Sequence, residues 1–326
     1  MRAVVLEQFP GPLRVVDDWP EPQPGSGQVV VQVSGVGICG SDLALLGGRR
    51  PPPALPWVPG HESAGEIVGA GPGADPGRIG QRVVIEPNFP CLSCPACQAG
   101  RSSACPHRVS LGFNAQGVLA ERIAVPAQFA WPVPERWSDA DAVCAEPLTV
   151  ARAAIRRAGL PPGPGSRCLV IGAGSQGSLL CLALVRHGLV PDVLEPHAGR
   201  RSLAVSLGAQ VAAETAGGYD AVFETSGVPA ALPGAVSRAG RGGTVLLIGQ
   251  NSEPASLVTR TVVQRQLTLR GSLIYDHPGD FAATLAAANG VAPSAVLRAC
   301  HPLADAAAAF QAARQVPGKT WIRMKD

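Results

Sequence analysis

The chain has 326 residues, of which 46% are hydrophobic, 27 are basic and 24 are acidic. This length predicts about two domains, with enough apolar residues for both cores. The charges are spread without long runs, which argues against the basic surface of a nucleic-acid-binding or membrane-surface protein.

Residues 3–6 and 28–33 are predicted strands, separated by a proline-rich turn region. The first apolar run is interrupted by Glu7 and is too short for a signal peptide. Residues 168–185 carry no charge, but the glycines within them favour a strand, a turn and a helix over a membrane span. Nine cysteines without an export signal favour metal ligation over disulfides. We therefore expect a soluble cytoplasmic protein with neither a membrane nor a nucleic acid as partner.

Residues 37–62 carry metal-binding side chains at both ends of one segment. Cys39 lies near its start, and His61 and Glu62 close it. Thiolate, imidazole and carboxylate are donors that zinc accepts, and a catalytic zinc needs three protein ligands and one open position. A lone cysteine and histidine are more often packed in a core, so this hypothesis depends on the rest of the chain. Between the ends, residues 49–53 are expected to form an exposed loop.

Strands are predicted at 63–68 and 82–86, and a four-cysteine segment follows. Its thiols, spaced to wrap one tetrahedral zinc with the closed shell of a structural site, are Cys91, Cys94, Cys97 and Cys105. Two disulfides are the alternative interpretation. A nucleic-acid zinc ribbon would show two separated Cys-x-x-Cys knuckles and a basic face, which this chain lacks. The segment has few large apolar residues, so we expect the metal to supply most of its folding energy.

Residues 111–125 are strand-like, and 138–154 are predicted to form one helix with Ser138 as its N-cap. Glu146 lies in this helix, just before Pro147, within an apolar run. A buried carboxylate needs a partner, and a metal or a metal-bound water would provide one. A basic side chain paired with a carboxylate near the helix N-terminus is the alternative.

A glycine-rich turn follows the predicted buried strand at 168–171. Gly172, Gly174 and Gly177 precede an apolar helix, and Glu195 ends the next predicted strand. Glycines in this pattern permit a tight turn and bring backbone N–H groups close to a pyrophosphate at the helix N-terminus. An acidic residue about twenty positions further on binds the adenosine ribose. The complete context therefore predicts dinucleotide binding.

The alternation of strands and helices continues after this turn. Strands are predicted at 221–224, 244–248 and 267–269, which together indicate a doubly wound parallel sheet. From about residue 276 we expect a helix at 280–288, a strand at 295–297, a helix at 304–314 and a final strand at 320–324. We expect this last segment to pack back onto the first domain.

Together these motifs resemble the zinc-dependent medium-chain dehydrogenase/reductase family, most closely its polyol, sorbitol and threonine dehydrogenase branch. The resemblance implies an α/β protein with a GroES-like β-rich catalytic domain and a Rossmann domain with a doubly wound parallel sheet. It implies a catalytic domain at 1–150 that includes a structural-zinc lobe at 91–105. An NAD-binding domain at 151–275 follows, and residues 276–326 return to the catalytic domain.

The resemblance also assigns roles residue by residue. It implies a catalytic zinc held by Cys39 and His61, by Glu62 directly or intermittently, and by Glu146 as third or water-bridged ligand. It implies a structural zinc on the four cysteines, and Ser41 as the group that accepts the alcohol proton and passes it on. The residues that would bind the cofactor are Gly172, Gly174, Ser175, Gln176, Gly177, Glu195, Arg200, Ile248, Gly249, Ser272 and Leu273.

The implied activity is hydride transfer between NAD(H) and a secondary alcohol or ketone of a polar metabolite, such as a polyol, sugar or aminocyclitol. Glu195 would repel a 2′-phosphate and favours NAD, although Arg200 and Arg201 keep NADP open. By the same analogy we expect a homo-oligomer, a dimer or tetramer, with a small-molecule substrate. Relatives commonly carry a histidine of the proton relay where this chain has Ala44.

Two other functions stay open from the sequence. The first is a reductase of an iminium or carbonyl group in a biosynthetic intermediate, which would need less proton transfer. The second is a nucleotide-binding protein without turnover, in which zinc is only structural. Trp57, Phe113 and Tyr275 are interpreted as packing residues rather than as the lining of a substrate pocket.

Overall fold

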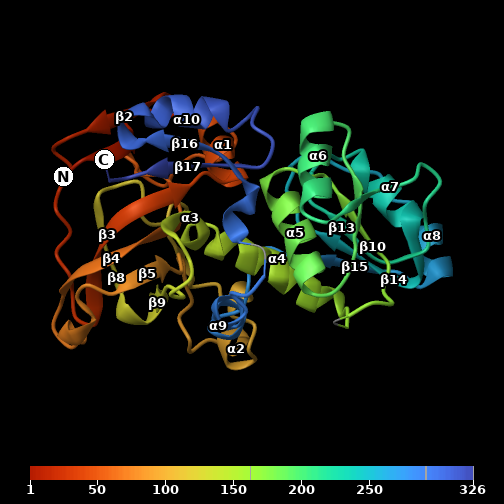
Figure 1. Ribbon diagram of the computed structural model, residues 1–326, viewed down its shortest axis with the longest axis horizontal. Helices are drawn as coiled ribbons and strands as arrows, with labels where there is room; N and C mark the ends of the chain where they lie inside the picture. The colour runs from red at the N-terminus through yellow and green to blue at the C-terminus, as the bar shows by residue number, and fades with distance from the viewer. Residues whose placement is uncertain (162, 291, 326) are drawn as a thin grey trace. The chain divides into compact units, whose positions relative to one another are not determined.

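The computed structural model describes residues 1–161, 163–290 and 292–325 (Figure 1). The chain forms two compact units. The first comprises Met1–Glu146, His277–Ala288 and Ala292–Asp326, and the second comprises Pro147–Asp276 and Asn289–Val291. The expected α/β fold class is confirmed, since one unit is mainly antiparallel sheet and the other is a parallel sheet with helices.

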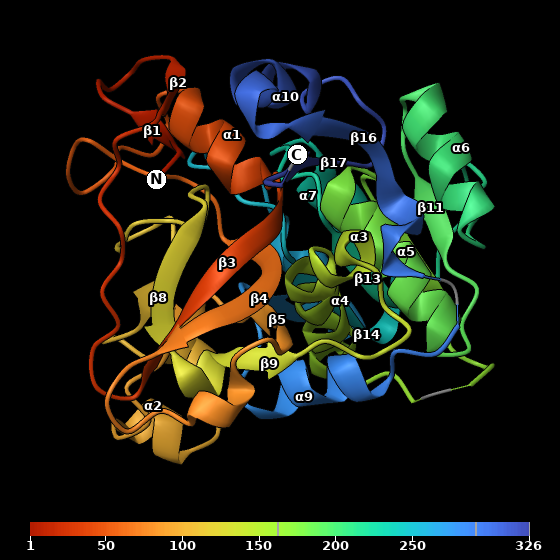
Figure 2. The same ribbon diagram turned by 60° about the vertical axis from the view of Figure 1, so that its left-hand side comes forward.

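A seven-stranded sheet organises the first unit, with strand order β16-β17-β3-β4-β5-β9 and β8 paired with β3. Figure 2 shows β3 between β4 and β8, and Figure 1 shows α10 beside β16 and β17. The strands are β3 (Gln28–Gly37), β4 (Glu62–Ala70), β5 (Arg82–Ile85), β8 (Arg122–Pro126), β9 (Ala130–Pro132), β16 (Leu297–Pro302) and β17 (Lys319–Arg323). Valine-rich β3 is buried along most of its length, because β-branched side chains suit a packed pleated sheet.

The register of this sheet brings distant segments together. Gly37, the last residue of β3, pairs with Glu62, the first residue of β4, and also with Trp321 of β17. The two ends of segment 37–62 therefore meet at one end of adjacent strands. The C-terminal strand is added on the other side of β3.

Shorter elements surround the sheet. Two small sheets pair β1 (Ala3–Leu6) with β2 (Leu13–Val16), and β6 (Asn88–Phe89) with β7 (Val109–Ser110). The helices are α1 (Gly40–Leu46), α2 (Pro95–Gln98), α3 (Asp139–Ala142), α9 (Gly279–Ala286) and α10 (Ala306–Ala312), with 3₁₀ turns η1 (Pro76–Arg78), η2 (Ser102–Ala104), η3 (Ala127–Phe129), η4 (Pro293–Val296) and η5 (Leu303–Asp305).

Three predicted elements differ from those observed. The single helix expected at 138–154 is two, α3 and α4 (Ala145–Ala158), because Pro147 has no N–H to donate to the carbonyl of Val143 and is tolerated only in a first helical turn. Of the strand expected at 111–125, only β8 is a regular strand at its end. The strand expected at 295–297 begins at Leu297 and is preceded by η4.

The second unit contains a parallel sheet of six strands in the order β12-β11-β10-β13-β14-β15. They are β10 (Cys168–Ile171), β11 (Asp192–Leu194), β12 (Gln210–Val211), β13 (Tyr219–Glu224), β14 (Ala239–Leu247) and β15 (Thr268–Gly271). Figure 1 shows α5 (Ser175–Arg186) and α6 (Ala198–Ser206) on one side of this sheet and α7 (Ala231–Arg238) and α8 (Thr259–Arg265) on the other. The strand order reverses between β10 and β13, where such sheets bind ligands.

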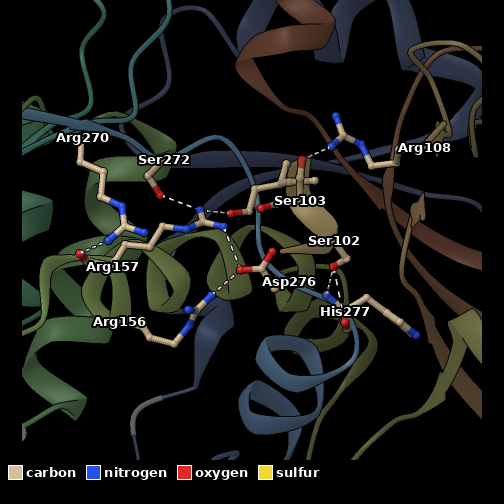
Figure 3. Close-up of polar contacts among 10 residues, drawn as sticks. Ser102, Ser103, Arg108, Arg156, Arg157, Arg270, Ser272, Asp276 and His277 are labelled. Atoms are coloured by element: carbon tan, nitrogen blue, oxygen red, sulfur yellow. Dashed lines mark hydrogen bonds and ion pairs between the residues drawn. The ribbon is translucent and has the colours of Figure 1, made fainter. Parts of the chain in front are cut away.

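The chain passes from the second unit to the first between Asp276 and His277. Side-chain contacts within each unit fix the residues before and after this position (Figure 3). Arg157 of α4 donates to Ser272 Oγ at 2.9 Å and to the Ile274 carbonyl, and Arg156 pairs with Asp276 at 2.7 Å. In the first unit the His277 N–H donates to Ser102 Oγ at 2.6 Å.

Across the parts of the chain that the structure describes, no helix has both the length and the apolar content that a bilayer crossing requires.

Candidate functional site

Cys39, His61 and Glu62 form a cluster at the ends of β3 and β4. Their ligand atoms all lie within 4.8 Å of one another, and both His61 and Glu62 are buried. The Glu62 side chain can lie this close to the end of β3 because residue 37 is a glycine. A Cβ at this position would lie 2.3 Å from Glu62 Oε2. We call these three residues the Cys39–His61–Glu62 cluster.

Asp42 contacts two residues of this cluster, Cys39 and His61. It is fully buried in α1, its Oδ2 accepts the Cys39 N–H at 3.0 Å, and its Oδ1 lies 3.6 Å from His61 Nδ1. Burial alone would raise the pKa of Asp42, but His61 and the Cys39 N–H outweigh it and lower that pKa. With Nδ1 facing Asp42, Nε2 is the ring nitrogen left for a metal, an arrangement typical of metal-binding histidines.

The same neighbours act on His61. Burial alone would lower its pKa, but Asp42 and Cys39 raise it well above the ordinary value. The surroundings of His61 therefore favour a proton or another positive charge at this position. A divalent cation would compete with that proton for the same acidic surroundings.

Lys319 of β17 places a positive charge next to Glu62 of the cluster. Its ammonium group pairs with Glu62 Oε2 and donates to the Ile38 carbonyl at 3.2 Å, and both charged side chains are almost completely buried. Burial alone would lower the pKa of Lys319, and Glu62 raises it above its ordinary value. Glu62 Oε1 is buried without a hydrogen-bond partner among the described residues. The donor set of one sulfur, one imidazole nitrogen and one carboxylate oxygen fits zinc.

Three other residues of the sequence hypothesis lie in or near helices α1 and α4. Ser41 is in the first turn of α1, and its Oγ is buried without a hydrogen-bond partner among the described residues. Ala44 follows in the same helix. Glu146 is buried in the first turn of α4, and the structure does not include it in the Cys39–His61–Glu62 cluster.

The four-cysteine segment also converges. Cys91, Cys94, Cys97 and Cys105 place their sulfurs within 4.8 Å of one another, and all nine cysteines of the chain are free thiols. Hydrogen bonds from the Ser93 backbone N–H and hydroxyl lower the pKa of Cys91 to about 5. The geometry therefore favours a tetrahedral zinc over the alternative of two disulfides.

The glycine-rich turn has the conformation that nucleotide binding requires. Gly172 has φ +87°, and a Cβ at Gly177 would lie 1.9 Å from the Gly172 carbonyl oxygen. A Cβ at Gly174 would meet nothing within 4 Å, so the N-terminus of the twelve-residue helix α5 is open at this point. This open helix end fits a pyrophosphate.

Glu195 lies next to this turn. It is buried, and its two carboxylate oxygens accept the Ala173 N–H at 2.7 Å and the His197 N–H at 2.8 Å. These bonds fix the carboxylate beside the turn. Arg201 turns away from the carboxylate and donates to the Glu195 and Pro196 carbonyl oxygens.

The remaining predicted cofactor residues are spread over the second unit. Gln176 donates to the Pro147 carbonyl at 3.2 Å, and Ser272 is buried and bound by Arg157. Gly249 packs against Gly227, since a Cβ there would lie 2.0 Å from the Gly227 nitrogen. The others are Ser175 at the start of α5, Arg200 in α6, Ile248 after β14 and Leu273, which is exposed.

The sequence hypothesis missed Asp42 and Lys319. Asp42 was recognisable from the local sequence, because it lies three residues after Cys39, the N-cap residue of α1, and its carboxylate accepts the Cys39 N–H. Nothing in the local sequence indicated a role for Lys319, since a lone lysine in a terminal strand is usually solvated. The expectation of an exposed loop at 49–53 is wrong for Arg50, which is half-buried beside Phe113 and Gly112.

Comparisons with known proteins show which family the chain resembles. Residues 25–135 match the family model of the alcohol dehydrogenase GroES-like domain, and residues 186–289 match that of zinc-binding dehydrogenases. The chain is 31% identical to the starvation-sensing protein RspB of Escherichia coli K12 over 291 residues, 83% of each protein. It is also 31% identical to L-threonine 3-dehydrogenase of Saccharopolyspora erythraea, again over 83% of each. The solved structure of the alcohol dehydrogenase RspB from Escherichia coli CFT073, with NADH, superposes with a TM-score of 0.91 at 26% identity and covers 99% of each chain.

Proposed function

The chain belongs to the zinc-type alcohol dehydrogenase family of medium-chain dehydrogenases, and from this premise we propose that it transfers hydride between a polar secondary alcohol and NAD. The observation that supports the proposal is the Cys39–His61–Glu62 cluster, whose three ligand atoms converge and could hold a zinc ion. Ser41, two residues after Cys39, has a buried hydroxyl without a hydrogen-bond partner among the described residues. A bound zinc would act as a Lewis acid on the substrate oxygen, and NAD would accept the hydride.

The chain's own residues have separate tasks in this reaction. Ser41, two residues after Cys39, has a hydroxyl without a hydrogen-bond partner among the described residues, so it can accept a hydrogen bond from the alcohol hydroxyl and relay its proton. Because Ala44 stands where relatives carry a histidine, that proton would leave to solvent or through a ribose hydroxyl of the cofactor. Asp42 orients His61, and Lys319 offsets the charge of Glu62. Glu146 stays a prediction as third or water-bridged ligand.

Two features support NAD as the cofactor. The Glu195 carboxylate is fixed beside the glycine-rich turn by two backbone N–H groups, and it would repel a 2′-phosphate. The RspB structure was solved with NADH. We extend to this chain a structural zinc on the four cysteines and, by analogy alone, a homo-oligomeric assembly.

The test combines metal counting with a substrate screen that follows the absorbance of NADH. Wild-type protein is expected to hold two zinc ions per chain and to reduce NAD with a polar secondary alcohol. Cys39→Ser is expected to keep the structural zinc and to lose about a thousandfold in kcat/KM, because Lewis-acid stabilisation is worth several kcal/mol. Glu146→Ala tests the predicted further ligand in the same assay.

Cys300→Ser is the matched control, since Cys300 is an exposed free thiol on β16. It should retain both zinc ions and full activity. A wild-type protein with a single zinc and no turnover on any alcohol would support a nucleotide-binding zinc protein instead.

A further inference from the structure

Arg50 is held close to the Cys39–His61–Glu62 cluster through aromatic contacts. Its Nη2 donates to the Gly112 carbonyl at 3.0 Å, and its guanidinium carbon lies 4.4 Å from the centre of the Phe113 ring. The Phe113 ring in turn lies 5.0 Å from the imidazole of His61. The cation is therefore fixed one aromatic ring away from a residue that we assign to zinc.

One polar atom of this guanidinium has no partner. Arg50 Nε is buried, and it finds no hydrogen-bond acceptor among the described residues. A buried N–H without a partner costs about 1–3 kcal/mol, and more when the group is charged. Such a group in a folded protein calls for an explanation. Because Arg50 as a whole is only half-buried, an oxyanion that reaches its guanidinium would supply an acceptor.

The surrounding charges leave this cation unbalanced. Burial lowers the pKa of Arg50, and Asp42 and Cys39 oppose that shift. Arg50 nevertheless forms no ion pair with any carboxylate in the described parts of the chain. Lys319 offsets Glu62, and a zinc ion would offset Asp42 and the Cys39 thiolate. The positive charge of Arg50 is then not balanced by any of these groups.

We propose that Arg50 binds the oxyanion of the substrate, a carboxylate or a phosphate ester, and thereby selects hydroxy acids or polyol phosphates over neutral polyols. The inference rests on the proposed dehydrogenase function and specifies the substrate class of the same site. Arginine suits the task because its planar N–H groups bind carboxylate and phosphate with directional, charge-assisted bonds. Phe113 contributes the apolar surface on which the guanidinium is stacked.

The experiment compares three substrates on one carbon skeleton: galactonate, galactitol 1-phosphate and neutral galactitol, each as both enantiomers where they exist. Wild-type protein is expected to show a kcat/KM at least tenfold higher for one of the anions than for galactitol. In Arg50→Gln this ratio should fall by about 10- to 100-fold, mainly through the KM of the anion, since a bond to a charged group is lost. Arg50→Lys should restore part of the ratio. Whichever anion loses more identifies the carboxylate or the phosphate.

Arg49→Gln is the matched control, because it removes the same charge from the neighbouring exposed position. It should leave the ratio within about twofold of wild type. A second readout does not depend on turnover. With NADH present, the preferred anion should raise the Tm of wild type and Arg49→Gln, and fail to raise that of Arg50→Gln.

Two results would overturn the inference while leaving the dehydrogenase function intact. One is oxidation of galactitol as efficiently as of either anion. The other is an Arg50→Gln variant whose anion-to-neutral ratio is unchanged while its KM for NAD rises, which would assign Arg50 to the cofactor phosphates. Failure of the dehydrogenase function itself is distinct, because the protein would then hold a single zinc and would oxidise no alcohol in the substrate screen, charged or neutral.

Discussion

Lys319 brings a full positive charge into the interior of the first unit, where Glu62 is its partner. A buried ion pair loses much of its attraction to the desolvation of both groups, so it adds little net stability. Removal of one partner is different, because it leaves the other charge buried and unpaired. Lys319 therefore matters chiefly as the positive partner of the buried Glu62 side chain, which is one of the three residues of the Cys39–His61–Glu62 cluster.

Lys319→Met removes the positive partner of Glu62 and leaves the carboxylate buried. In chelator-treated protein the variant should lose about 3–5 kcal/mol in the free energy of unfolding, measured by urea denaturation. Zinc should recover part of the loss, because the ion would give Glu62 a new positive partner in the folded state only. Wild type should gain less from zinc than the variant does.

The double variant Lys319→Met, Glu62→Gln is the control. It removes both charges, so it should be more stable than Lys319→Met alone in chelator. If the two substitutions instead add without interaction, the buried pair is not coupled as the geometry indicates.

Among single residues, candidate metal ligands are easier to recognise in the sequence than the residues that support them. Cys39, His61 and the four cysteines are recognisable because metal donors are rare residue types in a short segment. Lys319 and Arg50 are not recognisable, because their roles depend on the pairing of β17 with β3 and on the position of Gly112 and Phe113. Both look like ordinary surface cations in the sequence. Tertiary packing alone sets them beside the cluster.

At the scale of elements, Asp141 joins α3 to η4. Its Oδ2 accepts the Ser138 N–H at 3.0 Å and the Ser138 hydroxyl at 2.7 Å, and its Oδ1 accepts the Ser294 N–H at 3.1 Å. Burial alone would raise the pKa of Asp141, but the hydrogen bonds from Ser294 and Ser138 lower it below the ordinary value. The ionised carboxylate therefore stabilises the folded state.

We predict that Asp141→Asn lowers the free energy of unfolding at neutral pH by about 1–2 kcal/mol, since it weakens a helix cap and a tertiary bond together. The contribution of Asp141 is complete above its unfolded-state pKa and is lost as the pH falls through its lower folded-state pKa. The deficit of the variant should therefore shrink in acid, in urea denaturation at a series of pH values.

Asp139→Asn tests the specificity of that effect. Asp139 is in the same turn and its side chain is 45% exposed, where it pairs with Arg82 at the surface. An exposed pair contributes little, so this substitution should change stability by less than about 0.5 kcal/mol. An equal pH-dependent loss in both variants would contradict the role given to Asp141.

Elements were predictable where local sequence determines them. Five strands of the parallel sheet contain short apolar runs that were located correctly, because no tertiary contact is needed to recognise them; these are β10, β11, β13, β14 and β15. The exposed two-residue strand β12 was not predicted. The 111–121 segment was not predictable. Gly112 and Gly117 pack against the backbone of Pro59 and Gly60, so its shape is set by a contact distant in sequence.

For the chain as a whole, the tryptophans and the candidate ligand sites are divided unevenly between the two units. All five tryptophans lie in the first unit, at Trp19, Trp57, Trp131, Trp137 and Trp321. Both metal-binding clusters are in that unit as well, whereas the glycine-rich turn and Glu195 are in the second. Each unit also has its own hydrophobic core. Zinc and dinucleotide should therefore stabilise different parts of the chain.

The last prediction follows from this separation. Urea unfolding followed by tryptophan emission reports the first unit, while far-ultraviolet circular dichroism reports helices and strands of both. Removal of zinc with dipicolinate should move the tryptophan transition to lower urea, because a metal that binds only the folded state stabilises it by mass action. NADH should instead move the part of the dichroism transition that has no tryptophan counterpart, since the residues proposed to bind its pyrophosphate and ribose lie in the second unit. The non-chelating isomer dinicotinate is the control, and zinc added back should reverse the shift.

If both ligands moved both signals equally, the chain would unfold as one cooperative body, and the assignment of each ligand to one unit would lose this support.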